Sequence, residues 1–135
     1  AQAMSRIHVL LPVHDRRETT RRFVDCLLAQ TCRDWRLVLV DDGCRDGTAG
    51  MVLDAIPGAT VLRGDGDLWW AGALQRALDQ LAAEGLPDDD LVLFINDDVR
   101  FRPDYLERAQ AVMAGKRGTL VLSRFTDPDG GEPLE

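Results

Sequence analysis

Four short apolar runs, each separated from the next by a segment long enough for a helix, constrain this chain more than any other feature of its sequence. They span residues 7–11, 37–40, 60–62 and 91–95, and a run at 119–122 is a plausible fifth. Their Val, Ile and Leu residues are nearly continuous, which is typical of strands buried on both faces of a parallel sheet. We therefore predict an α/β fold with an open, mainly parallel, wound sheet flanked by helices.

The segments between the apolar runs carry helical signals. We predict helices over 17–30, 49–56, 70–84 and 103–114 from the spacing of their apolar residues. Asp46 is placed to cap the second helix, Gly85 to end the third, and Pro103 suits the first turn of the fourth. One domain over residues 4–125 accounts for these elements. Residues 126–135, rich in Gly, Pro and acidic residues, are predicted to be a frayed or truncated tail.

The composition excludes several classes of protein. The chain has 135 residues, of which 45% are hydrophobic, and a net charge of −7. It is therefore expected to be globular and not to bind nucleic acid. No apolar run approaches the ~20 residues of a membrane span. The three cysteines form no C-x-x-C pair and have no histidine at zinc-ligand spacing. This predicts free thiols and a cytoplasmic protein, either in the cytosol or at the inner face of the membrane.

Acidic residues gather where the predicted strands end. Asp41-Asp42 follows the second apolar run, and Asn96-Asp97-Asp98 follows the fourth. Ligands of a wound sheet bind beyond the carboxyl ends of its strands, so we expect these side chains to meet at one rim. A cation or hydrogen-bond donors would relieve the repulsion between their carboxylates.

Each of these positions also has an alternative reading that the sequence leaves open. Oxygen ligands at 96–98 suit Mg²⁺ or Mn²⁺ bridged by a diphosphate, but Asn and Asp are also common turn residues. Asp42 is the better choice for facing a ligand, and Asp46 the better choice for capping a helix. Trp69 and Trp70 offer rings that can stack on a base or a sugar, although we expect one of the two to pack in the core.

Several of these motifs together resemble one known family. The segments at 9–14, 27–31, 40–48 and 96–98 resemble family 2 glycosyltransferases, and the resemblance runs from about residue 7 to residue 122. The stretch 67–72, Asp-Leu-Trp-Trp-Ala-Gly, is similar to the subset that includes bacterial rhamnosyltransferases. The resemblance implies the GT-A fold, with a Rossmann-like nucleotide-binding half, and transfer of a hexose from a nucleotide sugar with inversion.

The resemblance also implies roles for residues. Asp42 would contact the base, and Asn96-Asp97-Asp98 stands at the D-x-D-like metal motif, with Asp98 as the main ligand. The expected ligands are Mn²⁺ or Mg²⁺ and a UDP- or dTDP-sugar, and the acceptor would be an unknown saccharide or lipid-linked molecule. Patterns and resemblance together predict the metal ligands Asp98 and Asp97, and the donor-binding residues Pro12, Val13, His14, Asp41, Asp42, Trp69, Gly72, Asn96 and Asp97.

Other functions remain possible from the same features. A non-catalytic nucleotide-binding module, or a degenerate transferase, would keep the fold without transferring sugar. A phosphoacceptor receiver domain needs an acidic pair after the first strand and a Lys after the fifth, whereas the only lysine here is Lys116. A dinucleotide dehydrogenase needs glycines after the first strand, where none is found. The family's acceptor half and catalytic base normally follow this segment, so we assign no catalytic residue and expect this chain alone to be inactive.

Overall fold

The computed structural model describes residues 6–87, 89–114, 125–126 and 133–134. The elements are β1 (Ile7–Val13), α1 (Arg17–Leu28), β2 (Trp35–Asp42), α2 (Thr48–Ala55), β3 (Thr60–Gly64), α3 (Trp69–Glu84), β4 (Leu91–Phe94), α4 (Tyr105–Met113), β5 (Phe125–Thr126) and β6 (Pro133–Leu134). The predicted alternation of strands and helices is confirmed through α4. The plausible fifth strand at 119–122 lies outside the described residues.

A four-stranded, all-parallel sheet forms the centre of the fold, with the strand order β3-β2-β1-β4. Ile7 of β1 lies opposite Trp35 of β2 on one side and Leu91 of β4 on the other. β1 and β2 are the most deeply buried strands, as their continuous apolar runs predict, while β3 and β4 are only partly covered. The predicted fold class is therefore confirmed. β5 and β6 form a separate antiparallel pair.

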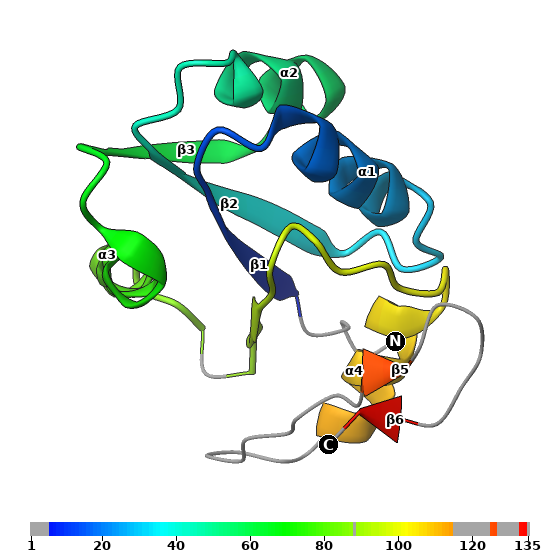
Figure 1. Ribbon diagram of the computed structural model, residues 1–135. Helices are drawn as coiled ribbons and strands as arrows, with labels where there is room; N and C mark the ends of the chain where they lie inside the picture. The colour runs from blue at the N-terminus through cyan, green and yellow to red at the C-terminus, as the bar shows by residue number, and fades with distance from the viewer. Residues whose placement is uncertain (1–5, 88, 115–124, 127–132, 135) are drawn as a thin grey trace.

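Helices cover both faces of the sheet. Figure 1 shows α1 and α2 on one face and α3 on the other. Phe23 of α1 and Val52 of α2 belong to one buried cluster with β1 and β2, whereas Leu74 and Leu81 of α3 belong to a second cluster with Leu10 of β1. None of the helices in the described ranges is long and apolar enough to cross a membrane. Because the strands are parallel, the helices that follow β1, β2 and β3 all begin near their carboxyl ends.

The ends of three helices test the local signals in the sequence. Gly85 ends α3 with a φ of 79°, as predicted. The prediction that Asp46 caps α2 is wrong by one residue: the cap is Gly47, whose φ of 82° suits glycine, and the Asp46 carboxylate instead accepts the N–H and O–H of Thr48. The expectation of a first-turn Pro103 is also wrong, because α4 begins at Tyr105 after a turn that contains the proline.

Candidate functional site

The residues that follow β1, β2 and β4 lie along one rim of the sheet, at the carboxyl ends of neighbouring parallel strands. Two hydrogen bonds tie α3 to this rim. The backbone N–H of Trp69 donates to the Asp42 carboxylate at 3.2 Å, and the indole N–H of Trp70 donates to Asn96 Oδ1 at 2.7 Å. The structure thus brings together the ends of β2 and β4 and the start of α3, as the sequence predicts.

Asp42 is the centre of the contacts between β2 and the β3–α3 loop. Its Oδ1 accepts the backbone N–H groups of Gly66 at 2.8 Å and Leu68 at 3.3 Å, and its Oδ2 accepts that of Trp69. The residue is only 6% exposed. The side chain expected to face a ligand therefore holds this loop, and its remaining acceptor position is on Oδ2.

The other residues predicted at the ends of β1 and β2 differ in their access to solvent. Asp41 is buried and accepts the N–H of Cys44 at 2.8 Å and a guanidinium N–H of Arg63 at 3.0 Å. Val13 is buried in the core, whereas Pro12 is half-buried. His14 is exposed, and its Nδ1–H donates to the backbone carbonyl of Asp42, a bond that raises the pKa of the imidazole. Of these residues, His14 has the side chain most accessible to a ligand.

The two carboxylates after β4 have different surroundings. Asp97 is buried, and its carboxylate accepts the O–H of Thr20 at 3.0 Å and lies 3.3 Å from the guanidinium of Arg16. Burial raises the pKa of Asp97 against the opposing effects of Thr20 and Arg16. The Asp98 side chain is 55% exposed and lies 3.8 Å from Arg16. Asp98 is therefore the more accessible of the two carboxylates, and Asp97 is held by Thr20 of α1 and by Arg16, the residue before α1.

Arg16 and Thr20 are site residues that the sequence did not reveal. Both belong to the segment that opens α1, and each contacts Asp97 across a long separation in the chain, 77 residues in the case of Thr20. No local motif marks them. Only the parallel pairing of β1 with β4, which places α1 beside the end of β4, brings them to Asp97.

The expectation that one of the two tryptophans packs in the core is wrong. Trp69 is 78% exposed and Trp70 is 53% exposed. Trp69 also has a φ of 57°, which is unusual for a bulky residue. Gly72 lies one turn further along α3, where an added Cβ would meet the side chain of Leu68 at 3.4 Å, so it faces the protein's own loop.

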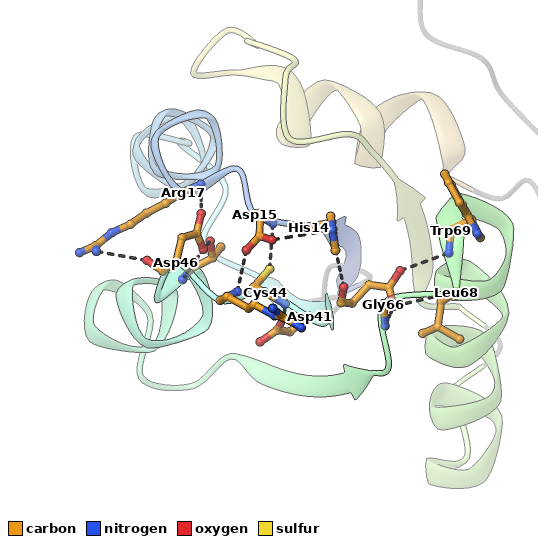
Figure 2. A network of polar contacts seen from close by, with 12 residues as sticks. His14, Asp15, Arg17, Asp41, Cys44, Asp46, Gly66, Leu68 and Trp69 are labelled. Carbon is orange, nitrogen blue, oxygen red and sulfur yellow. Dashed lines mark hydrogen bonds and ion pairs between the residues drawn. The ribbon is translucent and has the colours of Figure 1, made fainter.

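A second polar network joins the starts of α1 and α2 (Figure 2). Asp15, Cys44 and Asp46 each offer one side-chain atom that could bind a metal ion, and these three atoms lie within 4.8 Å of one another. This is the one such group of three among the described residues. Asp46 accepts the N–H of Arg17 as well as the groups of Thr48. Burial raises the pKa of the Cys44 thiol to about 12, so it stays protonated. These contacts explain the network as a link between two helices.

Comparisons with known proteins agree with this geometry. The family model for glycosyl transferase family 2 matches residues 8–134. The mannosyltransferase PcManGT from Pyrobaculum calidifontis, in complex with GDP-Man and Mn²⁺, is similar in structure with a TM-score of 0.70 and 22% identity, over 85% of this chain and 34% of that one. TarS 1-349 of S. aureus in complex with UDP gives a TM-score of 0.65 and 18% identity, over 81% and 32%.

A third structure extends the same similarity. Glucosyl-3-phosphoglycerate synthase from Mycobacterium tuberculosis, in complex with Mn²⁺, UDP and glucosyl-3-phosphoglycerate, gives a TM-score of 0.52 and 22% identity, over 73% of this chain and 36% of that one. No curated protein matches the chain. The chain spans about a third of the length of each of these three structures, with which it shares the GT-A fold. On the family match over residues 8–134, the chain belongs to glycosyltransferase family 2.

Proposed function

We propose that this chain binds the donor of a glycosyltransferase, a nucleoside-diphosphate sugar held through Mn²⁺ or Mg²⁺. The observation that carries the proposal is the exposed carboxylate of Asp98 at the carboxyl rim of the sheet, directly after the buried Asp97. Carboxylate oxygen is the ligand that these hard cations prefer, and Mg²⁺ keeps several water and phosphate ligands when the protein offers only one or two. Asp98, with support from Asp97, suits such a site.

The rest of the donor would lie along the rim towards β1 and β2. Pro12 and the exposed His14 would approach the nucleoside, and the raised pKa of His14 favours a positive charge near a phosphate. Asp41 and Asp42 are buried and would act mainly by holding the loops of this rim in place, with the last acceptor position on Asp42 left for a base or ribose. The structures of similar fold that contain UDP or GDP-Man support a nucleotide-sugar donor. Within this class, we propose a UDP- or dTDP-sugar as the donor of this chain.

Arg16 would change partners when the donor binds. Its guanidinium contacts Asp97 and Asp98, so it offsets their charge in the structure described here. Without a cation, each carboxylate facing a diphosphate at ~4 Å and an effective dielectric of ~20 costs on the order of 4 kcal/mol before screening. A divalent cation at Asp98 reverses the sign of that interaction and leaves Arg16 available to the phosphates.

Calorimetric titration tests the proposal. UDP-, dTDP- and GDP-sugars are titrated into the wild type and Asp98→Ala, each with Mn²⁺ and with EDTA. We expect tight binding only for the wild type with Mn²⁺, and no metal dependence in Asp98→Ala. Asp54→Ala is the matched control, because Asp54 is an exposed acid near the far end of α2. Equal affinity of the wild type for the nucleotide sugar in Mn²⁺ and in EDTA would exclude a role for the metal in donor binding. Residues 96–98 would then be interpreted as a polar turn.

The reaction that this donor site serves would be an inverting hexosyl transfer to a saccharide or lipid-linked acceptor. The three cysteines of the described part are free thiols, in keeping with a cytoplasmic site for that reaction. Since the chain spans about a third of the transferases of similar fold, we expect it to bind donor without transferring sugar by itself. Transfer of a radiolabelled sugar by the purified 135-residue chain would contradict this part of the proposal.

A further inference from the structure

Two consecutive tryptophans stand out of the protein at the start of α3. Trp69 is 78% exposed and Trp70 is 53% exposed. Burying a large aromatic side chain stabilises a protein, and neither residue contributes that gain in full. Trp69 also has a φ of 57°, in the left-handed region that a residue with a Cβ avoids. Exposed and strained residues of this kind are typical of functional sites.

Both tryptophans are held in place by residues of the rim. The Asp42 carboxylate accepts the backbone N–H of Trp69, and Asn96 accepts the indole N–H of Trp70. In Figure 2 the ring of Trp69 points away from the polar network that holds its backbone. Trp70 is thus held by its ring and Trp69 by its backbone, so the Trp70 ring in particular needs little further ordering when a flat ligand binds.

The position of the pair relates it to the metal motif. Asn96, which Trp70 contacts, directly precedes Asp97 and Asp98. Arg16 and Thr20 approach that motif from α1, which covers the opposite face of the sheet from α3. A diphosphate bound at Asp98 would therefore have the tryptophans on one side of it and α1 on the other.

We propose that Trp69 and Trp70 form a stacking platform for a pyranose ring of a saccharide acceptor, an inference that rests on the proposed function. The C–H face of a sugar is apolar and packs on the face of an indole, while the hydroxyl groups at the ring edge remain hydrated. The sequence placed Trp69 among the donor-binding residues, but its ring points away from the polar network at the ends of β1 and β2, along which the donor would lie. We therefore assign the platform to the acceptor and not to the donor sugar.

Tryptophan fluorescence tests the platform directly. The experiment is done in a Trp35→Phe background, so that the remaining indole emission comes from Trp69 and Trp70. The probes are methyl α-D-mannopyranoside, methyl β-D-glucopyranoside and methyl α-L-rhamnopyranoside, titrated with and without UDP and Mn²⁺. We expect at least one glycoside to change the emission saturably. Trp69→Ala should weaken that binding about fivefold or more, while Trp69→Phe should retain most of it.

Two further variants and one further ligand separate the possible outcomes. Leu78→Ala, at a partly exposed position further along α3, is the control that should bind the glycoside normally. Calorimetry with UDP and UDP-glucose shows whether Trp69→Ala affects the donor. A loss confined to UDP-glucose would assign the platform to the donor sugar, and a loss for UDP itself would assign it to the base; either result overturns our assignment to the acceptor.

The failure of this inference is distinguishable from that of the proposed function. No saturable response to any of the three glycosides, with or without nucleotide, overturns the platform while leaving donor binding intact. A wild type that binds no nucleotide under any condition overturns the proposed function, and the titration without nucleotide then still decides whether the tryptophans bind a sugar ring. Circular dichroism of Trp69→Ala and Trp69→Phe confirms that both variants are folded.

Discussion

Replacing Asp42 is the most informative perturbation of this fold. Its carboxylate is the shared acceptor of three backbone N–H groups, from Gly66, Leu68 and Trp69. Asp42→Ala removes all three bonds at once. Asp42→Asn keeps a carbonyl oxygen that can serve Gly66 and Leu68, but its amide N–H₂ would oppose the N–H of Trp69, since both groups are donors.

The size of the effect follows from the number and kind of bonds. A hydrogen bond to a charged group contributes roughly 1.5–3 kcal/mol. The loop is only half-buried, so its N–H groups can turn partly to water, and the three losses will not add in full. We expect Asp42→Ala to lower the free energy of unfolding by about 2–4 kcal/mol, and Asp42→Asn by about 1–2 kcal/mol, the difference being the bonds to Oδ1 that asparagine preserves.

Urea denaturation followed by circular dichroism measures these changes. With a slope of about 1–3 kcal/mol/M, Asp42→Ala should move the midpoint down by about 0.7 M or more. The matched control is Asp67→Ala, an exposed acid of the same loop, for which a change within about 0.5 kcal/mol is expected. A midpoint for Asp42→Ala that coincides with that of Asp67→Ala would refute the reasoning. The same measurement shows whether any loss of nucleotide affinity in Asp42→Asn reflects a lost contact or a displaced loop.

The backbone and two titrating side chains, Glu84 and Cys44, supply the remaining predictions. Gly43→Ala should lower the free energy of unfolding by about 1–3 kcal/mol, because φ is 78° and the new Cβ would lie 3.0 Å from a backbone carbon of the β3–α3 loop. Gly50→Ala, on α2 with open space around it, should raise the free energy of unfolding by about 0.5–1 kcal/mol. Urea midpoints in the opposite order would be incompatible with this account. The Arg36 guanidinium lowers the pKa of Glu84 from 4.5 to about 2, so the stability contributed by the pair is present above pH 4.5 and lost as the pH falls towards 2. Over that pH range the melting temperature of Glu84→Gln should fall less than that of the wild type. An equal fall in the two proteins would contradict this prediction. Burial raises the pKa of Cys44 from 9.0 to about 12, so its alkylation by iodoacetamide, followed by mass spectrometry, should still be rising above about pH 10, where an ordinary thiol is already mostly ionised. A plateau reached at about pH 10 would show an ordinary thiol.

The fold was predictable because its main signal is redundant. β1 and β2 are buried along most of their length, so nearly every residue in them had to be apolar, and the helices between them repeat the pattern at helical spacing. The helix ends were less predictable. Asp46 and Thr48 both suit a helix start, and only the left-handed φ of Gly47 decides which residue caps α2.

The positions of the acidic residues at the strand ends were predictable, but their hydrogen-bond and ion-pair partners were not. Asp41, Asp42, Asp97 and Asp98 stand at strand ends that sequence order alone identifies. Their roles depend on hydrogen-bond donors far away in the chain: the backbone N–H groups that donate to the Asp42 carboxylate lie 24 to 27 residues later. A motif records which side chain is present, and the direction in which it points is decided by contacts that do not exist until the sheet has formed.

The order β3-β2-β1-β4 also has a consequence for the rate and sequence of folding. At the amino end of β1, Arg6 contacts Asp34, 28 residues away, and Asp90, 84 residues away. Closing the longer loop costs more chain entropy, and non-local pairing is slow to form. We therefore expect β1, β2 and β3 to assemble first and β4 to dock last, as the least protected strand in hydrogen exchange. The Asn96-Asp97-Asp98 segment would then reach Arg16 only in that final step.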